Sequence, residues 1–201
     1  MKKYITLLLL FTLLTNCKAQ MPIYDLEDIP NVVSGMKNRY IKDTKKLLDP
    51  YVGTYLFTNG NTSFKIVLEK KKESYNNVYF EDLIIGEYQY IENGIEKANT
   101  LDKLNMYYEN QMKHNINANI ILTGREKGCT DCTSTEKRLQ GGLTDPNYPN
   151  TSAEIQIRRI TVNGKAAITL NIYWIGPIAR TEGQIQTQPF IGPGLYTLIK
   201  Q

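Results

Sequence analysis

The sequence predicts an all-β fold in which eight or nine antiparallel strands form a meander that builds a lipocalin-like barrel or a sandwich. Runs in which apolar and polar residues alternate recur along the chain, and a period of two is typical of a strand with one buried face. Asn-Gly pairs lie between such runs, at residues 59–60, 93–94 and 163–164. Asn-Gly favours the tight turns of antiparallel hairpins, because both residues adopt positive φ readily. Many short strands joined in this way suit a closed barrel or a sandwich.

Residues 1–16 have the pattern of a lipoprotein signal peptide. Two lysines precede an uncharged run over residues 4–14, which is too short for a helix that spans a bilayer, since spanning takes about 20 apolar residues. Cys17 follows where a lipoprotein peptidase would cut before a lipid-modified cysteine, although Asn16 departs from the usual Gly, Ala or Ser at that position. Ordinary cleavage after Ala19 is the alternative.

Lipidation of Cys17 would anchor the protein to a membrane of the cell envelope. Two or three acyl chains give stable attachment, whereas one chain gives only marginal binding. We expect an outer-membrane location, facing either the periplasm or the exterior. Residues 17–37 contain two prolines and no sustained period, so we expect them to form a tether that leads to a single domain over residues 38–201.

The domain is expected to begin with one short helix over residues 34–50, where Ser34 can cap the first turn and Pro50 ends the last. After Pro50 the apolar period changes to two. We expect Phe64, Ile66, Leu68, Ile168, Leu170, Ile172 and Trp174 to point inward, and Lys65, Glu69 and Asn171 to point outward. Strands are expected near residues 51–58, 62–70, 78–86, 87–96, 116–124, 135–143, 153–162, 165–175 and 194–200.

Two parts of this pattern are irregular. Between residues 153 and 162 the apolar phase shifts by one residue, so an extra residue near Arg158 and Arg159 would restore the buried face. We therefore expect a β-bulge at that point. Residues 99–115 fit a strand, a helix or a loop equally well.

Cys129 and Cys132 lie together in the polar stretch GCTDCTS. Beyond a signal peptide the environment permits disulfides, so a local bridge in a surface loop is the first interpretation. Free thiols and a redox pair are the alternatives. A zinc site would need a second pair of ligands, and His114 is the only histidine of the chain.

Composition and spacing favour no catalytic, metal or cofactor site. The net charge of +4 falls to +2 when residues 1–16 are removed, and the one tight basic run, at residues 69–73, is flanked by glutamates. Nucleic-acid binding would call for lysines and arginines clustered on one face. His114 has no nucleophile motif beside it, and we expect an ordinary surface or partly packed residue. Glu81 and Asp82 are adjacent in a strand, so their side chains point to opposite faces.

The stretch LDPYVGTYLFTNGNTSFKIVLEK and the closing PGLYTLIKQ resemble a flavobacterial family of small predicted lipoproteins known only as a domain of unknown function. The resemblance runs from about Leu48 to residue 201. More distantly, Gly53-Thr54-Tyr55 at the start of the first strand is similar to the Gly-x-Trp of lipocalin-like barrels, with tyrosine in place of tryptophan. The first resemblance implies no activity, and the second implies a barrel.

The chain contains fourteen tyrosines, of which those at 75, 79, 88, 90, 107 and 108 are the most suggestive. Tyrosine joins apolar area to a hydrogen-bonding tip, which suits sugars and protein surfaces, but its strand propensity explains the same count. Our first hypothesis is a non-catalytic binding module for a small apolar ligand or a glycan. The alternative is an interaction or inhibitor protein that acts through its loops on an envelope or secreted protein, and an enzyme is the third. An apolar cavity would favour the first, and a filled interior with an exposed aromatic patch would favour the second.

Overall fold

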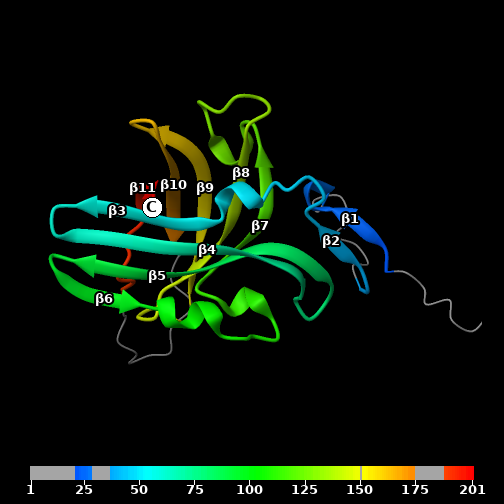
Figure 1. Cartoon of the computed structure of the whole chain (residues 1–201), viewed down its shortest axis with the longest axis horizontal. Coiled ribbons are helices and arrows are strands. Elements are labelled where there is room, and N and C mark those ends of the chain that lie inside the picture. Colours follow the sequence, from blue (N-terminus) through cyan, green and yellow to red (C-terminus); the bar gives the residue numbers. More distant parts are fainter. Residues whose placement is uncertain (1–20, 29–36, 150, 175–187) are drawn as a thin grey trace, which may run out of the picture.

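The computed structural model describes residues 21–28, 37–149, 151–174 and 188–201, and the fold is all-β (Figure 1). Eight antiparallel strands close a barrel in the order β3-β4-β5-β7-β8-β9-β10-β11, with β11 returning to β3. The strands are β1 (Ile23–Asp25), β2 (Tyr40–Lys42), β3 (Gly53–Asn59), β4 (Thr62–Tyr75), β5 (Phe80–Glu92), β6 (Ile95–Asn99), β7 (Ile116–Thr123), β8 (Lys137–Thr144), β9 (Ser152–Val162), β10 (Lys165–Trp174) and β11 (Gly194–Lys200). The 3-10 helices are η1 (Leu26–Asp28), η2 (Asp49–Tyr51), η3 (Leu101–Asn105), η4 (Gln111–Lys113) and η5 (Glu126–Gly128).

The predicted hairpins are present, with two differences in detail. Asn93-Gly94 and Asn163-Gly164 adopt positive φ and turn between β5 and β6 and between β9 and β10. The first turn is centred one residue later than expected, on Gly60 and Asn61. The two strands expected over residues 78–96 are one long strand, β5, because its residues pair without interruption with β4 from Ile91 to Leu83.

The helix expected over residues 34–50 is wrong for the part that the structure describes. Residues 29–36 lie outside the described residues, and residues 40–42 form β2, which pairs in parallel with the start of β5. Tyr40 and Ile41 are both buried, as a strand covered on two faces requires. Asp43 accepts hydrogen bonds from the backbone of Leu47 and Leu48 and stabilises a turn in place of a helix. Within the described residues, no helix is long and apolar enough to cross a bilayer.

Part of the expected tether belongs to the folded domain. Residues 23–25 form β1, which pairs in parallel with β2 (Figure 1). The following turn, η1, buries Leu26 in the core. Residues 23–28 of the expected tether therefore pack on the domain, while Cys17 itself lies outside the described residues.

Side chains fill the barrel interior. Phe64 lies at its centre, with the rings of Tyr88, Tyr90 and Tyr196 packed edge-on at 5.5–5.9 Å between centroids. Many of the inward side chains are 0% exposed, so no water-sized space borders them. The predicted inward orientation is confirmed for six core residues, Phe64, Ile66, Leu68, Ile168, Leu170 and Ile172. Trp174 is half-buried at the barrel end. The residues expected to point outward, Lys65, Glu69 and Asn171, lie on the outer face with partial exposure.

The β-bulge expected near Arg158 and Arg159 is absent from the described strands β9 and β10, which pair in continuous register from Val162 opposite Lys165 to Ala153 opposite Trp174. Alternate side chains of β9 continue to face inward as far as Arg159, and the Ile160 side chain faces outward. No bulge is needed because this end of the β9–β10 hairpin extends past the core, where the inner face need not be apolar. Register shifts occur instead in β4, between Lys71 and Ser74, and in β7, between Ala118 and Ile120.

Candidate interaction site

An open groove of about 500 Å³ lies beside β5, between the end of β4 and the segment that carries η3 and η4. In Figure 1 this segment is the green stretch with helical turns below β5. The groove brings together parts of the chain that are some thirty residues apart in sequence. Its lining residues are Lys71, Lys72, Glu73, Ser74, Tyr75, Phe80, Leu104, Asn105, Met106, Tyr107, Tyr108, Glu109 and Gln111.

Residues 99–115, whose structure the sequence leaves open, form two short 3-10 helices tied at both ends. At the first end, the backbone N–H of Thr100 donates to the carbonyl of Tyr88 at 2.8 Å, and the Thr100 hydroxyl accepts from the Tyr88 N–H at 3.1 Å. At the second end, the Asn110 side chain caps η4 by accepting from the N–H of Met112 at 2.9 Å, and the side-chain amide of Asn117 in β7 donates to the carbonyl of Met112 at 3.0 Å. The stretch between these ties is held in place without belonging to a strand.

A buried polar pair lies beneath the second end. His114 is 1% exposed, so it is not the surface or partly packed residue expected from its neighbours. Its Nδ1 lies 2.8 Å from Oε1 of Glu87, a β5 residue on the outer face of the barrel. The ring of Tyr108 packs edge-on against the imidazole, with 4.8 Å between centroids. This pair supports one wall of the groove from below.

Large apolar side chains are exposed in and beside the groove. Tyr107 is 87% exposed, the highest value among the exposed large apolar residues of the described chain. The rings of Tyr75 and Phe80 lie 5.1 Å apart across the β4–β5 pairing. Phe80 is partly buried, whereas Val78, Met106 and Met112 are exposed. We call these six residues the aromatic patch. Exposed apolar side chains gathered in and beside a groove are typical of interaction sites.

Only some of the tyrosines singled out in the sequence contribute to this patch. Tyr88 and Tyr90 are core residues, and Tyr79 packs partly buried against the core. Tyr75, Tyr107 and Tyr108 line the groove. Sequence reasoning missed Met106, because an apolar residue in a segment of unknown conformation carries no sign of whether it is exposed. It also missed Phe80, which lies in an expected strand and was not singled out.

The adjacent carboxylates of β5 point to opposite faces, as predicted. Glu81 accepts hydrogen bonds from the side-chain amides of Asn76, at 2.8 Å, and Asn119. Burial raises the pKa of Glu81, and these two hydrogen bonds oppose that shift. Asp82 accepts from the hydroxyl of Tyr40 at 2.6 Å and from the backbone of Asp43 and Glu73 at 3.0 Å. Both are positioned as structural acceptors, one on each side of the sheet.

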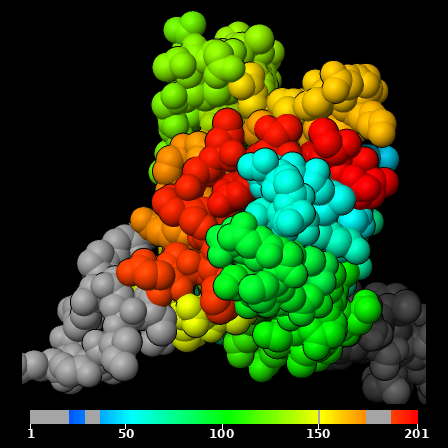
Figure 2. All heavy atoms as spheres, turned by 90° about the vertical axis from the view of Figure 1, so that its left-hand side faces the viewer, coloured from blue at the N-terminus to red at the C-terminus, as the bar shows by residue number. Residues whose placement is uncertain are grey.

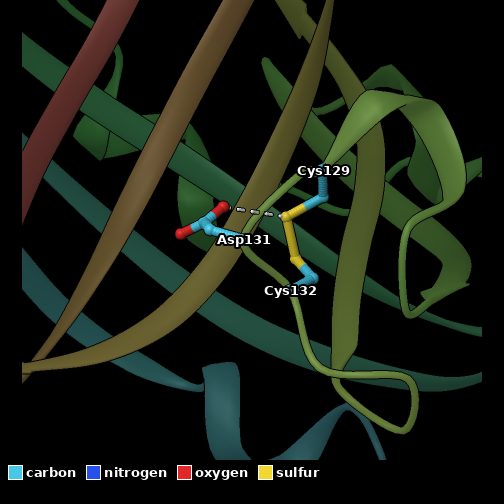
Figure 3. A group of neighbouring side chains, drawn as sticks. All are labelled: Cys129, Asp131 and Cys132. Atoms are coloured by element: carbon cyan, nitrogen blue, oxygen red, sulfur yellow. Dashed lines mark hydrogen bonds between the residues drawn. A yellow bond between two sulfur atoms is a disulfide. The ribbon is translucent and has the colours of Figure 1, made fainter.

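The paired cysteines lie in the loop between β7 and β8, in positions that allow a disulfide (Figure 3). Their Cα atoms are 5.5 Å apart, within the range of disulfide bridges. Between them, Asp131 reaches Arg158 of β9 with an Oδ2 to Nη1 distance of 2.7 Å. Cys129, Asp131 and Cys132 place their ligand atoms within 4.8 Å of one another. Sulfur atoms bonded to each other do not bind a metal as thiolates do, so this arrangement favours a bridged loop.

The comparison with protein families covers the whole chain. The model of the family described as "Family of unknown function (DUF6705)" matches residues 1–201. The chain belongs to this family. The DUF6705 match extends the expected resemblance, which began near Leu48, to the N-terminal segment as well. No curated protein and no solved structure matches the chain.

Proposed function

We propose that this DUF6705 protein is a lipid-anchored binding module of the cell envelope that holds a protein partner at the groove beside β5. The observation that supports this proposal is the aromatic patch, half of which lies on the β4–β5 end and half on the segment that carries η3 and η4. Tyrosine and methionine are enriched at protein interfaces, and methionine adapts to irregular partner surfaces. A pre-ordered surface of this composition loses little conformational entropy when a partner binds.

The filled interior also supports a surface site over an enclosed one. Our first hypothesis, a small apolar ligand inside the barrel, requires an apolar cavity. Phe64, Ile66 and Leu170, which would line that cavity, are 0% exposed. A ligand could enter the centre only if several core side chains moved, and close-packed cores resist such movement.

The rim of the groove favours a polypeptide partner. Lys71 and Lys72 lie on one side with Glu73, and Glu109 lies on the segment opposite. A rim with both signs of charge can complement a peptide surface that also carries both signs. A glycan is the second candidate, because the Asn105 amide lies beside exposed tyrosine rings and could bind sugar hydroxyls.

The short spacer before β1 places the proposed site near the membrane. Residues 18–22 alone separate Cys17 from β1, and an extended chain spans at most ~3.6 Å per residue. If Cys17 is lipidated, β1 therefore lies within about 20 Å of the anchor. β1 pairs with β2, and Tyr40 of β2 lies opposite Phe80 of the groove. The proposed partner is accordingly a protein of the same membrane or one held close to its surface.

Site-specific photo-crosslinking in intact envelopes tests this proposal. A photoreactive residue in place of Tyr107 should give a discrete crosslinked product. The matched control is the same residue in place of Ile95, which is also well exposed but lies at the β5–β6 turn, away from the groove. Equal products from both positions, or none from position 107, would contradict the proposal.

The identified partner then allows a quantitative test. Tyr107→Ala should weaken its binding by tenfold or more, as the loss of an interface hot spot of about 2 kcal/mol or above does, while thermal unfolding stays unchanged. If purified glycans bind instead, and Tyr107→Ala abolishes that binding, the second candidate replaces the first.

A further inference from the structure

A second hollow, of about 390 Å³, opens at the end of the barrel nearest η2. It shares no lining residue with the groove beside β5. Figure 2 shows the C-terminal residues in red between the β3–β4 strands in cyan and the β9–β10 hairpin in gold and orange, the strands that surround this opening. The lining residues are Pro50, Tyr55, Arg159, Ile160, Thr161, Ala166, Ala167, Ile168 and Lys200.

The register shows that two cations occupy inward positions in this hollow. Arg159 of β9 lies opposite Ile168, which is buried in the core. Lys200 of β11 lies opposite Tyr55, which is buried as well. Both cationic side chains therefore face the barrel interior, just beyond the last layer of packed core residues. One step further toward the end of the barrel, β10 places Ala166 opposite Thr161, and this small side chain fills little of the hollow.

Lys200 is held in place by close packing. Its ammonium donates to the carbonyl of Val52 at 2.8 Å and lies 5.6 Å from the centre of the Tyr55 ring. Gly53 makes room for the Lys200 stem, because a Cβ at that position would lie 2.6 Å from the Lys200 Cε. The residues Gly53 and Tyr55, noted in the sequence for their likeness to a barrel motif, thus position a cation at the barrel end.

The two cations of the hollow differ from Lys70 in having no carboxylate partner among the described residues. Lys70 contacts Asp43 and Asp49, at 2.7 and 2.6 Å. Among the described residues, no carboxylate lies within 4.0 Å of the cationic groups of Arg159 or Lys200. The guanidinium of Arg159 instead lies 5.8 Å from the centre of the Tyr51 ring. Two like charges in one hollow repel each other, and an anion between them relieves that repulsion.

We infer that this hollow binds a small organic anion, with a carboxylate or phosphate group between Arg159 and Lys200 and an apolar body against the surrounding side chains. Arginine recognises both groups through paired N–H donors. Pro50 and Ala166, both exposed at the hollow, supply apolar contact for the rest of the ligand. The hollow is too small and too open to enclose a long acyl chain, so the anionic group carries the recognition.

Titration of the full chain carrying Cys17→Ser tests the inference, with inorganic phosphate, phenyl phosphate and hexanoate as soluble probes. Calorimetry should show saturable binding, and the NMR signals of the Ala166 and Lys200 amides should shift. Vesicles that contain phosphatidylglycerol form the fourth probe. Binding of the soluble probes indicates a free ligand, and binding of the vesicles alone indicates a lipid headgroup as the source of the same anionic group.

Charge-removing variants assign any binding to the hollow. Arg159→Gln and Lys200→Gln should each weaken it about ten- to a hundredfold, since hydrogen bonds to charged groups contribute roughly 1.5–3 kcal/mol. Ala166→Leu should block the phenyl phosphate site by filling it. Lys165→Gln, which removes an exposed charge from the outward phase of the same hairpin, is the control. Failure of all four probes to bind, or an equal loss with Lys165→Gln, overturns the inference.

Discussion

The Nδ1 atom of His114 lies 2.8 Å from Oε1 of Glu87, and neither side chain has any exposed area. The backbone N–H of Asn115 donates to the same carboxylate oxygen at 3.3 Å. The remaining Oε2 of Glu87 and Nε2 of His114 have no hydrogen-bond partner among the described residues. This pair joins His114, two residues before β7, to the middle of β5, and Tyr108 packs on top of it. The only histidine of the chain thus supports the wall of the proposed interaction site.

Replacement of His114 should destabilise the protein by leaving Glu87 buried without its partner. We expect His114→Phe, which keeps a planar ring beneath Tyr108, to lower the free energy of unfolding by about 1–3 kcal/mol. Urea unfolding measures this loss. The double variant with Glu87→Leu should recover part of it, because replacing both members of a buried polar pair costs less than removing one. A double variant no better than the sum of its singles would contradict this account.

Phe64 should be among the most sensitive positions of the core. Its ring contacts three tyrosine rings, and the side chain is fully buried. We expect Phe64→Ala to lower the free energy of unfolding by about 3–5 kcal/mol, since a large cavity would remain. Leu195→Ala, on the exposed side of β11, should change it by less than about 0.5 kcal/mol. Similar effects at both positions would mean that the barrel interior is not close-packed.

The pH dependence of stability should contain a contribution from Glu81. Burial raises its pKa in the folded state above the unfolded value of about 4.3. The folded form then binds the proton more tightly, so the contribution of Glu81 to stability is present below pH 4 and is lost as the pH rises through the folded pKa. Glu81→Gln should therefore gain stability relative to the original protein between pH 4 and pH 7. Urea unfolding at several pH values would refute this if the difference stayed constant.

The Cys129–Cys132 bridge should have a modest structural effect. We expect no titratable thiol in protein isolated from the envelope until a reductant is added. Cys129→Ser with Cys132→Ser should lower the free energy of unfolding by about 2 kcal/mol or less, because the closed loop is short. Loss of partner binding without loss of stability would instead indicate a redox function for the pair.

Cys17→Ser should release the protein from membranes into the soluble fraction. Mass spectrometry of the original protein should find a lipid-modified N-terminus at Cys17, because this cysteine follows the short apolar run at the distance that lipoprotein processing requires. Insertion of a flexible stretch after Gln20 offers a second measurement, since it should move the domain away from the membrane without changing its stability. An unmodified chain that begins at Gln20 would show that ordinary cleavage after Ala19 takes place.

The candidate site could be predicted only in part. Tyr107 and Tyr75 were notable in the sequence, since tyrosine suits binding surfaces, but the same reasoning selected Tyr88 and Tyr90, which are core residues. Residues 99–115 contain no period, so their local sequence could not indicate which side chains would be exposed. Their conformation depends on distant partners such as Glu87 for His114 and Asn76 for Asn110.

By itself, the sequence determined the position of most barrel strands, most of their turns and the inward phase of strands such as β4 and β10, because alternation and Asn-Gly turns act between residues close in the chain. Only the tertiary structure decided how the sheet closes, through the pairing of β3 with β11 and of β5 with β7. It also decided that residues 23–28 and 40–42 join the fold, that His114 is buried, and that Arg159 and Lys200 line one hollow at the end of the barrel. These features depend on contacts between residues far apart in the chain, and their stability comes from burial and pairing that no local pattern records.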